Sequence, residues 1–361
     1  LFKRARIIGR RFKLVHVHHR REMIEVATYR AAPGTENAHH HKQSHTGRVL
    51  RDNVYGSLIE DALRRDFTAN ALYLDPIAGE VVDYQGGVED IQNHHLELIG
   101  DPDKRFAEDP VRMLRALRFK AKLGFDIPEL LDDLIEKHQH HFSDVSNARL
   151  FDETFKLFHH AHAEESWHTL CEHGFLPILF PLTEDMIEQD EMVEDFILRA
   201  LENTDRRVAQ GKPVIPAFFF AVLLWHAYQQ ERRANQDLPR GREGVYRAAE
   251  NIFARQYPVI AIPKRVSTVI IEIWDMQWYL EQRRPQSIET LLSNRRFRAA
   301  YDFLLLREKI NEIGPEIPQW WTRIQDLDES GRREMIAALP GVKKPGGGRR
   351  GRPRKRNPSD S

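Results

Sequence analysis

Features of exported and membrane proteins are scarce in this sequence. Among its 361 residues Cys171 is the single cysteine, so no internal disulfide can form, and we expect a reducing, cytoplasmic compartment. Apolar runs are short, and none approaches the roughly 20 residues that a membrane-spanning helix needs. We therefore expect no membrane partner. Hydrophobic residues make up 41% and charged residues 30% of the chain, which is typical of a globular protein with a highly charged surface.

The first residues lack the signals that usually open a folded unit. The chain starts LFKRARIIGRRFKLV, without Met and without a capping or turn residue. We expect it to begin inside a structural element, as a fragment of a longer chain would. Its length still allows two or three packed units, because domains typically hold about 100–200 residues.

A net charge is also missing, since 54 Lys and Arg balance 54 Asp and Glu. The balance hides a basic terminus: residues 343–361 hold eight Lys or Arg and one Asp, a net +7, so the other 342 residues sum to −7. A terminus this rich in Gly, Pro and Arg cannot bury apolar surface, and we expect it to be disordered. Clustered cations suit RNA phosphates, although a merely solubilising tail is the alternative. The candidate RNA-binding residues are Arg349, Arg350, Arg352, Arg354, Lys355 and Arg356.

Mixed α and β structure is predicted for the first hundred residues. The runs RFKLVHV (11–17) and EMIEVATYR (22–30) are β-branched and apolar around a short polar turn, which predicts a hairpin. Residues 31–49 hold almost no apolar side chains and predict a mobile loop. Further on, ALYLD (71–75) and GEVVDY (79–84) predict two strands around a turn.

A helix is predicted between these strands. Ser57 and Glu60 match a capping box, and Ile59, Leu63 and Phe67 repeat at helical spacing. We expect the helix to give way near Phe67.

Long helices are predicted beyond a last short strand, LELIG (96–100). Apolar residues recur every three or four positions from there to about residue 340, so this part should be almost entirely helical. One helix is predicted to begin with Asp109 as N-cap and Pro110 at its first position, and to end before Gly124.

The string EDALRRDFTANALYLD (60–75) is the most informative in the sequence. Asp66 falls on the helical face of Ile59, Leu63 and Phe67, and an acid buried there must be paired with Arg64, Arg65 or another cation, or must face a polar cleft. Spacing alone leaves a structural ion pair and a functional site equally open.

This string resembles the RRDFTxNA motif of the class II nucleotidyltransferases, the group that contains bacterial poly(A) polymerases and tRNA CCA-adding enzymes. The resemblance implies that Arg64, Arg65, Asp66 and Asn70 line a nucleotide pocket, with Asp66 catalytic. It also implies an α+β fold: part of a nucleotidyltransferase head with a mixed or antiparallel sheet (1–100), then a helical neck that binds nucleotide and RNA (101–200), a helical RNA-binding body (201–340) and a disordered basic tail (341–361).

Glu25 is a lone acid inside the predicted strand 22–30. Its neighbours Ile24 and Val26 point to the opposite face by the period-two rule. Such an acid is often exposed or salt-bridged. The resemblance implies instead that Glu25 is the third carboxylate of a two-metal site.

The string DYQGGVED holds paired glycines that permit unusual backbone angles. Asp83, Gly86, Gly87 and Asp90 stand where the family has its connector between head and neck. The resemblance implies a hinge, and an ordinary strand-to-helix turn is the alternative.

Arginines recur every three residues in RFAEDPVRMLRALRF, at Arg112, Arg115 and Arg118, so they lie along one side of a helix. They form either a solvated face or an anion-binding face. The string resembles the family's EDxxRxxR motif, which implies that Asp109 and Arg112 recognise the base, while Arg115 and Arg118 support the pocket or bind triphosphate.

Two further patterns are read as structural. ARLFDETFKLF (148–158) resembles the family motif that stabilises the neck helices, and Arg149, Glu153 and Lys156 can pair at helical spacing. The 18 histidines lack the ligand pattern of a closed zinc site, so we expect surface histidines.

The resemblance implies transfer of AMP from ATP to RNA 3′ ends, without a template, in support of RNA decay and with possible accessory proteins. Two Mg²⁺ ions about 3.5–4 Å apart would be needed, and carboxylates would hold them. The family's DxD pair and Gly-rich stretch have no counterpart in this sequence, so we expect the two further metal ligands to lie outside it and this polypeptide alone to be inactive.

Two alternatives stay open. A tRNA CCA-adding enzyme shares the quoted motifs, although GRRFKLVHV, the polar loop 31–49 and the basic tail favour a poly(A) polymerase. A non-catalytic RNA-binding protein is the other alternative, and the intact RRDFTANA string argues against it.

Overall fold

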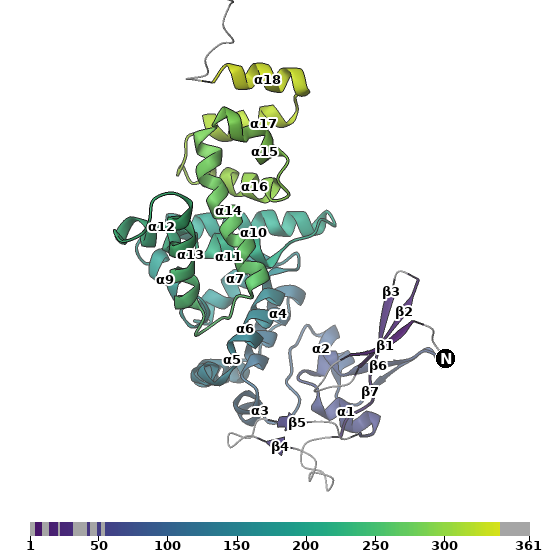
Figure 1. The fold of residues 1–361 in the computed structure, drawn as a ribbon. Helices are drawn as coiled ribbons and strands as arrows, with labels where there is room; N and C mark the ends of the chain where they lie inside the picture. Colours follow the sequence, from purple (N-terminus) through teal and green to yellow (C-terminus); the bar gives the residue numbers. More distant parts are fainter. Residues whose placement is uncertain are drawn as a thin grey trace, which may run out of the picture.

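The computed structural model describes residues 4–8, 14–20, 22–31, 42–43, 49–51 and 55–339. The predicted basic tail and most of the predicted loop 31–49 lie outside the described residues. Small antiparallel sheets occupy one end of the molecule, and helices continue from them to the opposite end (Figure 1). The predicted α+β fold with a mostly helical second part is confirmed.

The first sheet consists of β1 (Ala5–Ile8), β2 (Leu14–His19) and β3 (Glu22–Val26), in that order. The antiparallel β2–β3 pair confirms the predicted hairpin, and its register sets His16 opposite Glu25 and Val17 opposite Ile24. Val17 is buried, whereas Ile24 is exposed. Within the described part, this sheet therefore adds little to the hydrophobic core.

Two other strand pairs follow. β4 (Lys42–Gln43) pairs with β5 (Val49–Arg51), and β6 (Leu72–Asp75) pairs with β7 (Glu80–Asp83), both antiparallel. The second pair confirms the strands predicted from ALYLD and GEVVDY. The strand predicted from LELIG is wrong. The Leu96 N–H donates to Asp126 O and the Ile99 N–H donates to Asp66 O, so the backbone hydrogen bonds of this segment go to two different segments and not to one neighbouring strand.

Helix α1 (Leu58–Arg64) has the predicted capping box between Ser57 and Glu60. It ends at Arg64, before the predicted apolar repeat does. Ile59 and Leu63 are exposed while Phe67 is fully buried, so the predicted common face of Asp66 and these residues is wrong. The chain leaves helical geometry at Arg65. The burial of Asp66 and Phe67 is therefore independent of the faces of α1.

The connection from sheet to helices contains the 3₁₀ turn η2 (Thr68–Asn70), α2 (Gly87–Gln92), α3 (Pro102–Glu108) and α4 (Val111–Leu123). The prediction that Asp109 caps α4 is wrong. Pro110 is the N-cap without a side-chain bond, and Asp109 ends α3 instead. Gly124, with φ 65°, ends α4 as predicted.

The helices that follow extend toward the far end of the molecule, where those of residues 285–337 lie (Figure 1). They are α5 (Glu129–His138), η3 (Gln139–Asp144), α6 (Asn147–Phe158), α7 (Ala163–Glu172), α8 (Leu176–Leu179), α9 (Pro181–Ile187), α10 (Met192–Ala209), α11 (Pro216–Leu223), α12 (Trp225–Ala234), α13 (Arg242–Gln256), α14 (Lys264–Gln282), α15 (Pro285–Leu292), α16 (Phe297–Lys309), α17 (Glu316–Gln325) and α18 (Glu329–Ala337). In the described part, no helix is long and apolar enough to cross a bilayer.

One large core cluster runs from Phe67 to Ile310, and a second one lies around Trp321. Helix α14 contributes to both, through Trp274 in the first cluster and Leu280 in the second. The continuous core fixes the segment around Phe67 against the helices, which positions the site described next.

Candidate nucleotide-binding site

An ion pair between Asp66 and Arg115 lies at the centre of the candidate site. Asp66 follows α1 and is 8% exposed, and its Oδ2 accepts a hydrogen bond from Arg115 Nε on α4. Its Oδ1 accepts from Asn70 Nδ2 at 2.5 Å and from the Phe67 N–H at 3.2 Å. The cation predicted to neutralise Asp66 is therefore Arg115 rather than Arg64 or Arg65.

The Asp66 carboxylate is held in its ionised form. Burial by itself would raise its pKa, but the charge and hydrogen bond of Arg115, together with the hydrogen bond from Asn70, outweigh burial and lower the pKa below its ordinary value. A buried acid held in this way accepts hydrogen bonds and does not exchange protons near neutral pH.

Neighbours of Asp66 fasten the motif to the rest of the molecule. The Phe67 ring packs edge-on against Phe119 of α4, with 5.4 Å between ring centroids. Thr68 Oγ1 donates to Asp90 Oδ2 at 2.6 Å, which ties the RRDFTANA string to α2. Geometry of Asp66 therefore depends on residues from three separate strings.

A cluster of arginines surrounds the end of α1. Arg105 of α3 donates from Nη2 to Arg64 O at 3.1 Å and to Arg65 O at 2.5 Å, which satisfies carbonyls at the helix end. Burial, with the charges of Arg30, Arg105 and Arg65, lowers the pKa of the Arg64 guanidinium to about 10. Arg64 therefore lies in a region of positive charge at the end of α1.

Asp61 is a connecting residue that the sequence analysis did not single out. Its side chain accepts hydrogen bonds from Arg65 Nη2 at 3.2 Å, from Tyr73 OH at 2.8 Å and from the Arg30 N–H at 3.1 Å. These partners come from α1, β6 and the segment after β3. Arg65 is thus held against the sheet, with its guanidinium 5.5 Å from the Tyr73 ring centroid.

Asp109 pairs with Arg149 of α6 in a bidentate arrangement, with both N–O distances 2.7 Å. Of the three residues predicted to pair at helical spacing, Glu153 and Lys156 do pair, at 2.9 Å, whereas Arg149 takes Asp109 as its partner. A cavity of about 170 Å³ adjoins the Asp109–Arg149 pair and is also lined by His141. The bidentate pair fixes the orientation of the Asp109 carboxylate at this cavity.

The three predicted arginines of α4 have different partners. Arg112 Nη1 donates to Arg105 O at 2.6 Å and lies 3.4 Å from Glu108 Oε2, whereas Arg115 binds Asp66. Burial first, and then the Arg115 charge, lower the pKa of Arg118, while the Glu153 and Asp66 carboxylates oppose this change. The structure therefore brings Asp66 and the three arginines into one charged region.

Asp66 and Asp109 lie within the electrostatic range of one residue, Arg105. Burial and the Arg112 charge lower the pKa of Arg105, and the carboxylates of Glu108, Asp66 and Asp109 oppose that shift. Arg105, which donates hydrogen bonds to the carbonyls at the end of α1, thus interacts electrostatically with acids from both predicted motifs.

Glu25 stands apart from these contacts. It lies on β3 with its side chain 57% exposed, and its Oε1 is 2.9 Å from His16 Nε2 on β2. In the described part of the chain, no group of three or more His, Cys, Asp or Glu side chains is arranged to hold a metal ion.

The paired glycines have separate structural roles. Gly86 adopts φ 78°, and a side chain on Gly87 would place Cβ 2.2 Å from Thr68 O. Asp83 accepts from the N–H groups of Gln85 and Val88 at 2.9 Å, which caps the start of α2. These residues build a tight turn against the RRDFTANA string.

Comparison with known proteins decides the family. The sequence matches the descriptions "Poly A polymerase head domain" over residues 1–97, "Probable RNA and SrmB-binding site of polymerase A" over 124–187, and "Polymerase A arginine-rich C-terminus" over 240–358. It is 36% identical to poly(A) polymerase I of Escherichia coli O157:H7 and 37% identical to that of Salmonella typhimurium LT2; each alignment covers 99% of this chain and 78% of the relative. The chain belongs to the poly(A) polymerase family. It is accordingly an enzyme of the polynucleotide adenylyltransferase and nucleotidyltransferase class.

More distant relatives share part of this family resemblance. The CCA-adding enzyme of Bacillus pumilus is 32% identical over 52% of this chain and 45% of its own length. The solved structure of the Bacillus stearothermophilus CCA-adding enzyme in complex with CTP superposes with a TM-score of 0.54 at 23% identity, covering 94% of this chain and 70% of the other. This similarity shows a common fold.

Residues that sequence analysis missed share one property. Asp61 and Arg105 each bond to partners on other elements, and Arg105 reaches back 40 and 41 positions to the end of α1. Helical periodicity carries no signal for such pairs. Asp66 differs, because its expected burial predicted that it must pair with a cation, although it did not predict that the cation is Arg115.

Proposed function

We propose that this enzyme transfers AMP from ATP to RNA 3′ ends without a template, and thereby promotes RNA decay in bacteria. The Asp66–Arg115 pair carries the proposal, because it joins the RRDFTANA string to the arginines of α4 in one charged region. Family membership supports polynucleotide adenylyl transfer. A cytoplasmic location and accessory decay proteins stay predictions.

The arginine cluster at the end of α1 binds the phosphates of ATP. Burial and the neighbouring cations lower the pKa of Arg64, so an anion that enters the cluster relieves mutual repulsion. Asp66, ionised and held by Arg115 and Asn70, accepts a hydrogen bond from a ribose hydroxyl.

Base choice without a template requires protein groups in place of a pairing strand. Asp109 and Arg112 take this role, as the family motif implies. The bidentate Arg149 contact orients Asp109, and the Arg105 carbonyl holds Arg112. Arg118 lies beside Arg115 and supports the phosphate region.

The family's two Mg²⁺ ions would supply an activated 3′-hydroxyl and charge neutralisation at the leaving group. The described residues do not fit such a centre, because they contain no cluster of three possible ligands and Glu25 is exposed beside His16. Among the described residues, Glu25 is the ligand that the family resemblance implies, and two further ligands outside this sequence stay a prediction.

The decisive experiment uses the enzyme expressed from its complete reading frame. It is incubated with labelled ATP or CTP and an RNA with a free 3′ end. We expect repeated incorporation of AMP and little CMP. Incorporation of CMP into a tRNA that lacks its terminal CCA would favour the second candidate, a CCA-adding enzyme, which relatives at 32% identity over half the chain support.

Membership of the poly(A) polymerase family argues against the other alternative, a non-catalytic RNA-binding protein. The head (1–100), neck (101–200), body (201–340) and tail (341–361) are proposed as functional divisions, with residues 124–187 contacting RNA in agreement with the family description that they match.

Glu25 has its own test in the same assay. Glu25→Gln should abolish incorporation at every Mg²⁺ concentration and leave the free energy of unfolding unchanged, because the side chain is exposed. Normal activity of this variant would remove Glu25 from the proposal.

A further inference from the structure

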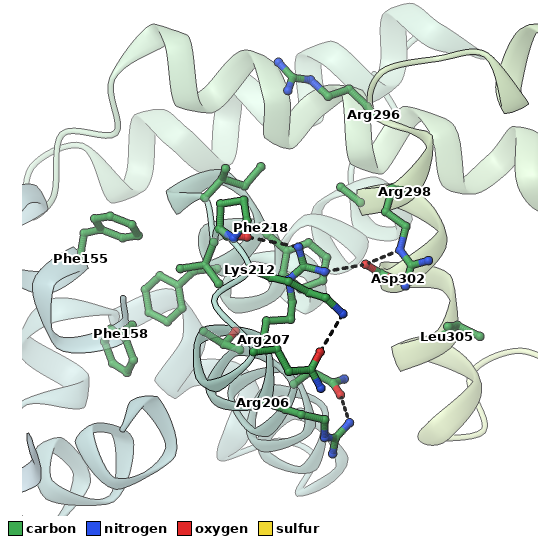
Figure 2. Close-up of a pocket in the computed structure, with 18 of the residues that line it drawn as sticks. Phe155, Phe158, Arg206, Arg207, Lys212, Phe218, Arg296, Arg298, Asp302 and Leu305 are labelled. Carbon is green, nitrogen blue, oxygen red and sulfur yellow. Dashed lines mark hydrogen bonds and ion pairs between the residues drawn. The ribbon is translucent and has the colours of Figure 1, made fainter. Parts of the chain in front are cut away.

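A second cavity lies in the helical body and shares none of its lining residues with the site around Asp66. Its volume is about 450 Å³, and α6, α10, α11 and α16 surround it (Figure 2). Cavities of about 300–1,000 Å³ are the size of small-molecule sites. This cavity therefore has room for one nucleotide unit.

Positive charge dominates the cavity lining. Among the described residues that line it, six are cations and Asp302 is the one acid: the cations are Arg206, Arg207, Lys212, Arg295, Arg296 and Arg298. Asp302 lies 2.9 Å from Arg298 and 3.9 Å from Arg207. Outside the lining, Glu272 pairs with Arg295 and Arg296, and Glu202 pairs with Arg206. Six cations thus face three acids, which leaves an excess of positive charge.

One wall of the cavity is aromatic. Figure 2 shows Phe155 and Phe158 on the side opposite Arg298 and Asp302. Phe158 is 2% exposed and stacks on Phe219, with 4.2 Å between centroids, so it belongs to the core. Phe155 is only half-buried. Phe218 and Phe219 also line the cavity and are half-buried, but both contact other phenylalanine rings, whereas the Phe155 ring contacts that of His159, with 5.2 Å between centroids. We therefore take Phe155 as the ring that accepts a planar partner.

We propose that this cavity binds one nucleotide of the RNA strand upstream of the 3′ end, with the base stacked on Phe155 and the flanking phosphates bound by Arg206 and Lys212. Proteins that bind single strands combine aromatic platforms with cationic grooves, and both are present here. The inference rests on the proposed function, because that function makes RNA the substrate.

Helix α6 connects the cavity to the nucleotide site. Arg149, the partner of Asp109, precedes Phe155 by six residues on this helix. At 1.5 Å per residue the two positions are about 9 Å apart along the axis. Six residues at 3.6 per turn also place Phe155 about 120° around the helix from Arg149, so a strand whose 3′ end lies near Asp109 would pass around α6 to place an upstream nucleotide in the cavity.

Binding of a labelled single-stranded oligoadenylate of about 16 nucleotides tests the proposal at several salt concentrations. The 361-residue chain is compared with the double variant Arg206→Glu/Lys212→Glu. The control is Arg247→Glu/Arg333→Glu, which makes the same charge change at exposed positions on α13 and α18. Affinity should fall at least tenfold in the cavity variant. The magnitude of the slope of log K against log salt concentration (the salt slope) should fall by about 1.4, since each of the two lost single-strand phosphate contacts contributes about 0.7.

Phe155→Ala separates stacking from charge. Its affinity for the same RNA should fall between about 5-fold and 150-fold, as expected for loss of one stacked base, with an unchanged salt slope. Duplex RNA of the same length should bind this variant and the parent chain equally, because its bases are paired. Circular dichroism checks that each variant is folded.

Equal losses in the cavity and control variants, or unchanged binding of Phe155→Ala, would overturn the assignment. These measurements contain no ATP. A chain that shows the expected binding losses but incorporates CMP would contradict the proposed function and leave the cavity assignment standing. Normal AMP incorporation with unaltered RNA binding in both cavity variants would contradict the cavity assignment and leave the proposed function standing.

Discussion

The Asp66 carboxylate accepts a hydrogen bond from the guanidinium of Arg115, 49 positions later in the chain. Asp66 lies between α1 and η2, and Arg115 lies on α4, so one ion pair connects the segment after the sheets to the first long helix. A substitution of Asp66 or Arg115 should therefore affect both the RRDFTANA string and the arginines of α4.

Removal of either charge should destabilise the fold. Breaking a buried ion pair typically costs about 3–5 kcal/mol, because the remaining charge stays desolvated. We expect this loss in the free energy of unfolding for Asp66→Asn and for Arg115→Met alone. The double variant should lose much less than the two together, which urea unfolding in a double-mutant cycle would detect. Additive losses would mean that the pair is not coupled.

Low pH should reduce the free energy of unfolding through protonation of Asp66. Its folded pKa lies below the ordinary value of about 3.9, so the pair contributes fully above that pH and is lost as pH falls through the folded pKa. The parent chain should therefore lose stability relative to Asp66→Asn below about pH 4. Urea midpoints measured at decreasing pH would check this, and parallel curves for the two proteins would contradict it.

Arg64→Gln should separate ATP binding from stability. Burial and three neighbouring arginines lower the pKa of Arg64 to about 10, so the charged side chain is disfavoured in the fold. We expect unchanged or greater stability and an increase in KM for ATP of about tenfold, the value of one lost charged hydrogen bond. Arg247→Gln, at an exposed position on α13, is the matched control and should leave KM for ATP unchanged. Unaltered KM in Arg64→Gln would exclude a phosphate role.

Arg149→Lys should relax base selection. Lysine cannot reproduce the two parallel 2.7 Å contacts to Asp109, so the carboxylate loses its fixed orientation. We expect the ratio of kcat/KM for ATP over CTP to fall about tenfold, which corresponds to about 1.4 kcal/mol. Lys156→Arg on the same helix serves as the control, and an unchanged ratio in Arg149→Lys would assign the pair to stability alone.

Gly87→Ala should disturb the turn that supports the RRDFTANA string. The new Cβ would lie 2.2 Å from Thr68 O, which demands a backbone shift costing about 3 kcal/mol. Gly79→Ala provides the control, because Gly79 has φ 71° and open space around it, so only backbone strain of about 1 kcal/mol applies. Equal thermal stabilities of the two variants would contradict the steric argument.

Local patterns in the sequence determined the elements correctly where the physics is local. The capping box of Ser57 and Glu60 and the end of α4 at Gly124 depend on residues a few positions apart. The β2–β3 hairpin and the β6–β7 pair likewise follow from alternation and short turns. Family motifs in the sequence pointed to the residues of the candidate site.

Tertiary structure decided which charges meet. Spacing predicted pairing among Arg149, Glu153 and Lys156; Glu153 pairs with Lys156, but the partner of Arg149 is Asp109, 40 positions away. Spacing also predicted Asp109 as a helix cap, and it ends the preceding helix instead. A buried carboxylate needs a cation, and sequence establishes that need; which arginine meets it depends on how α1, α3, α4 and α6 pack, because desolvation and ion pairing act through space and not along the chain.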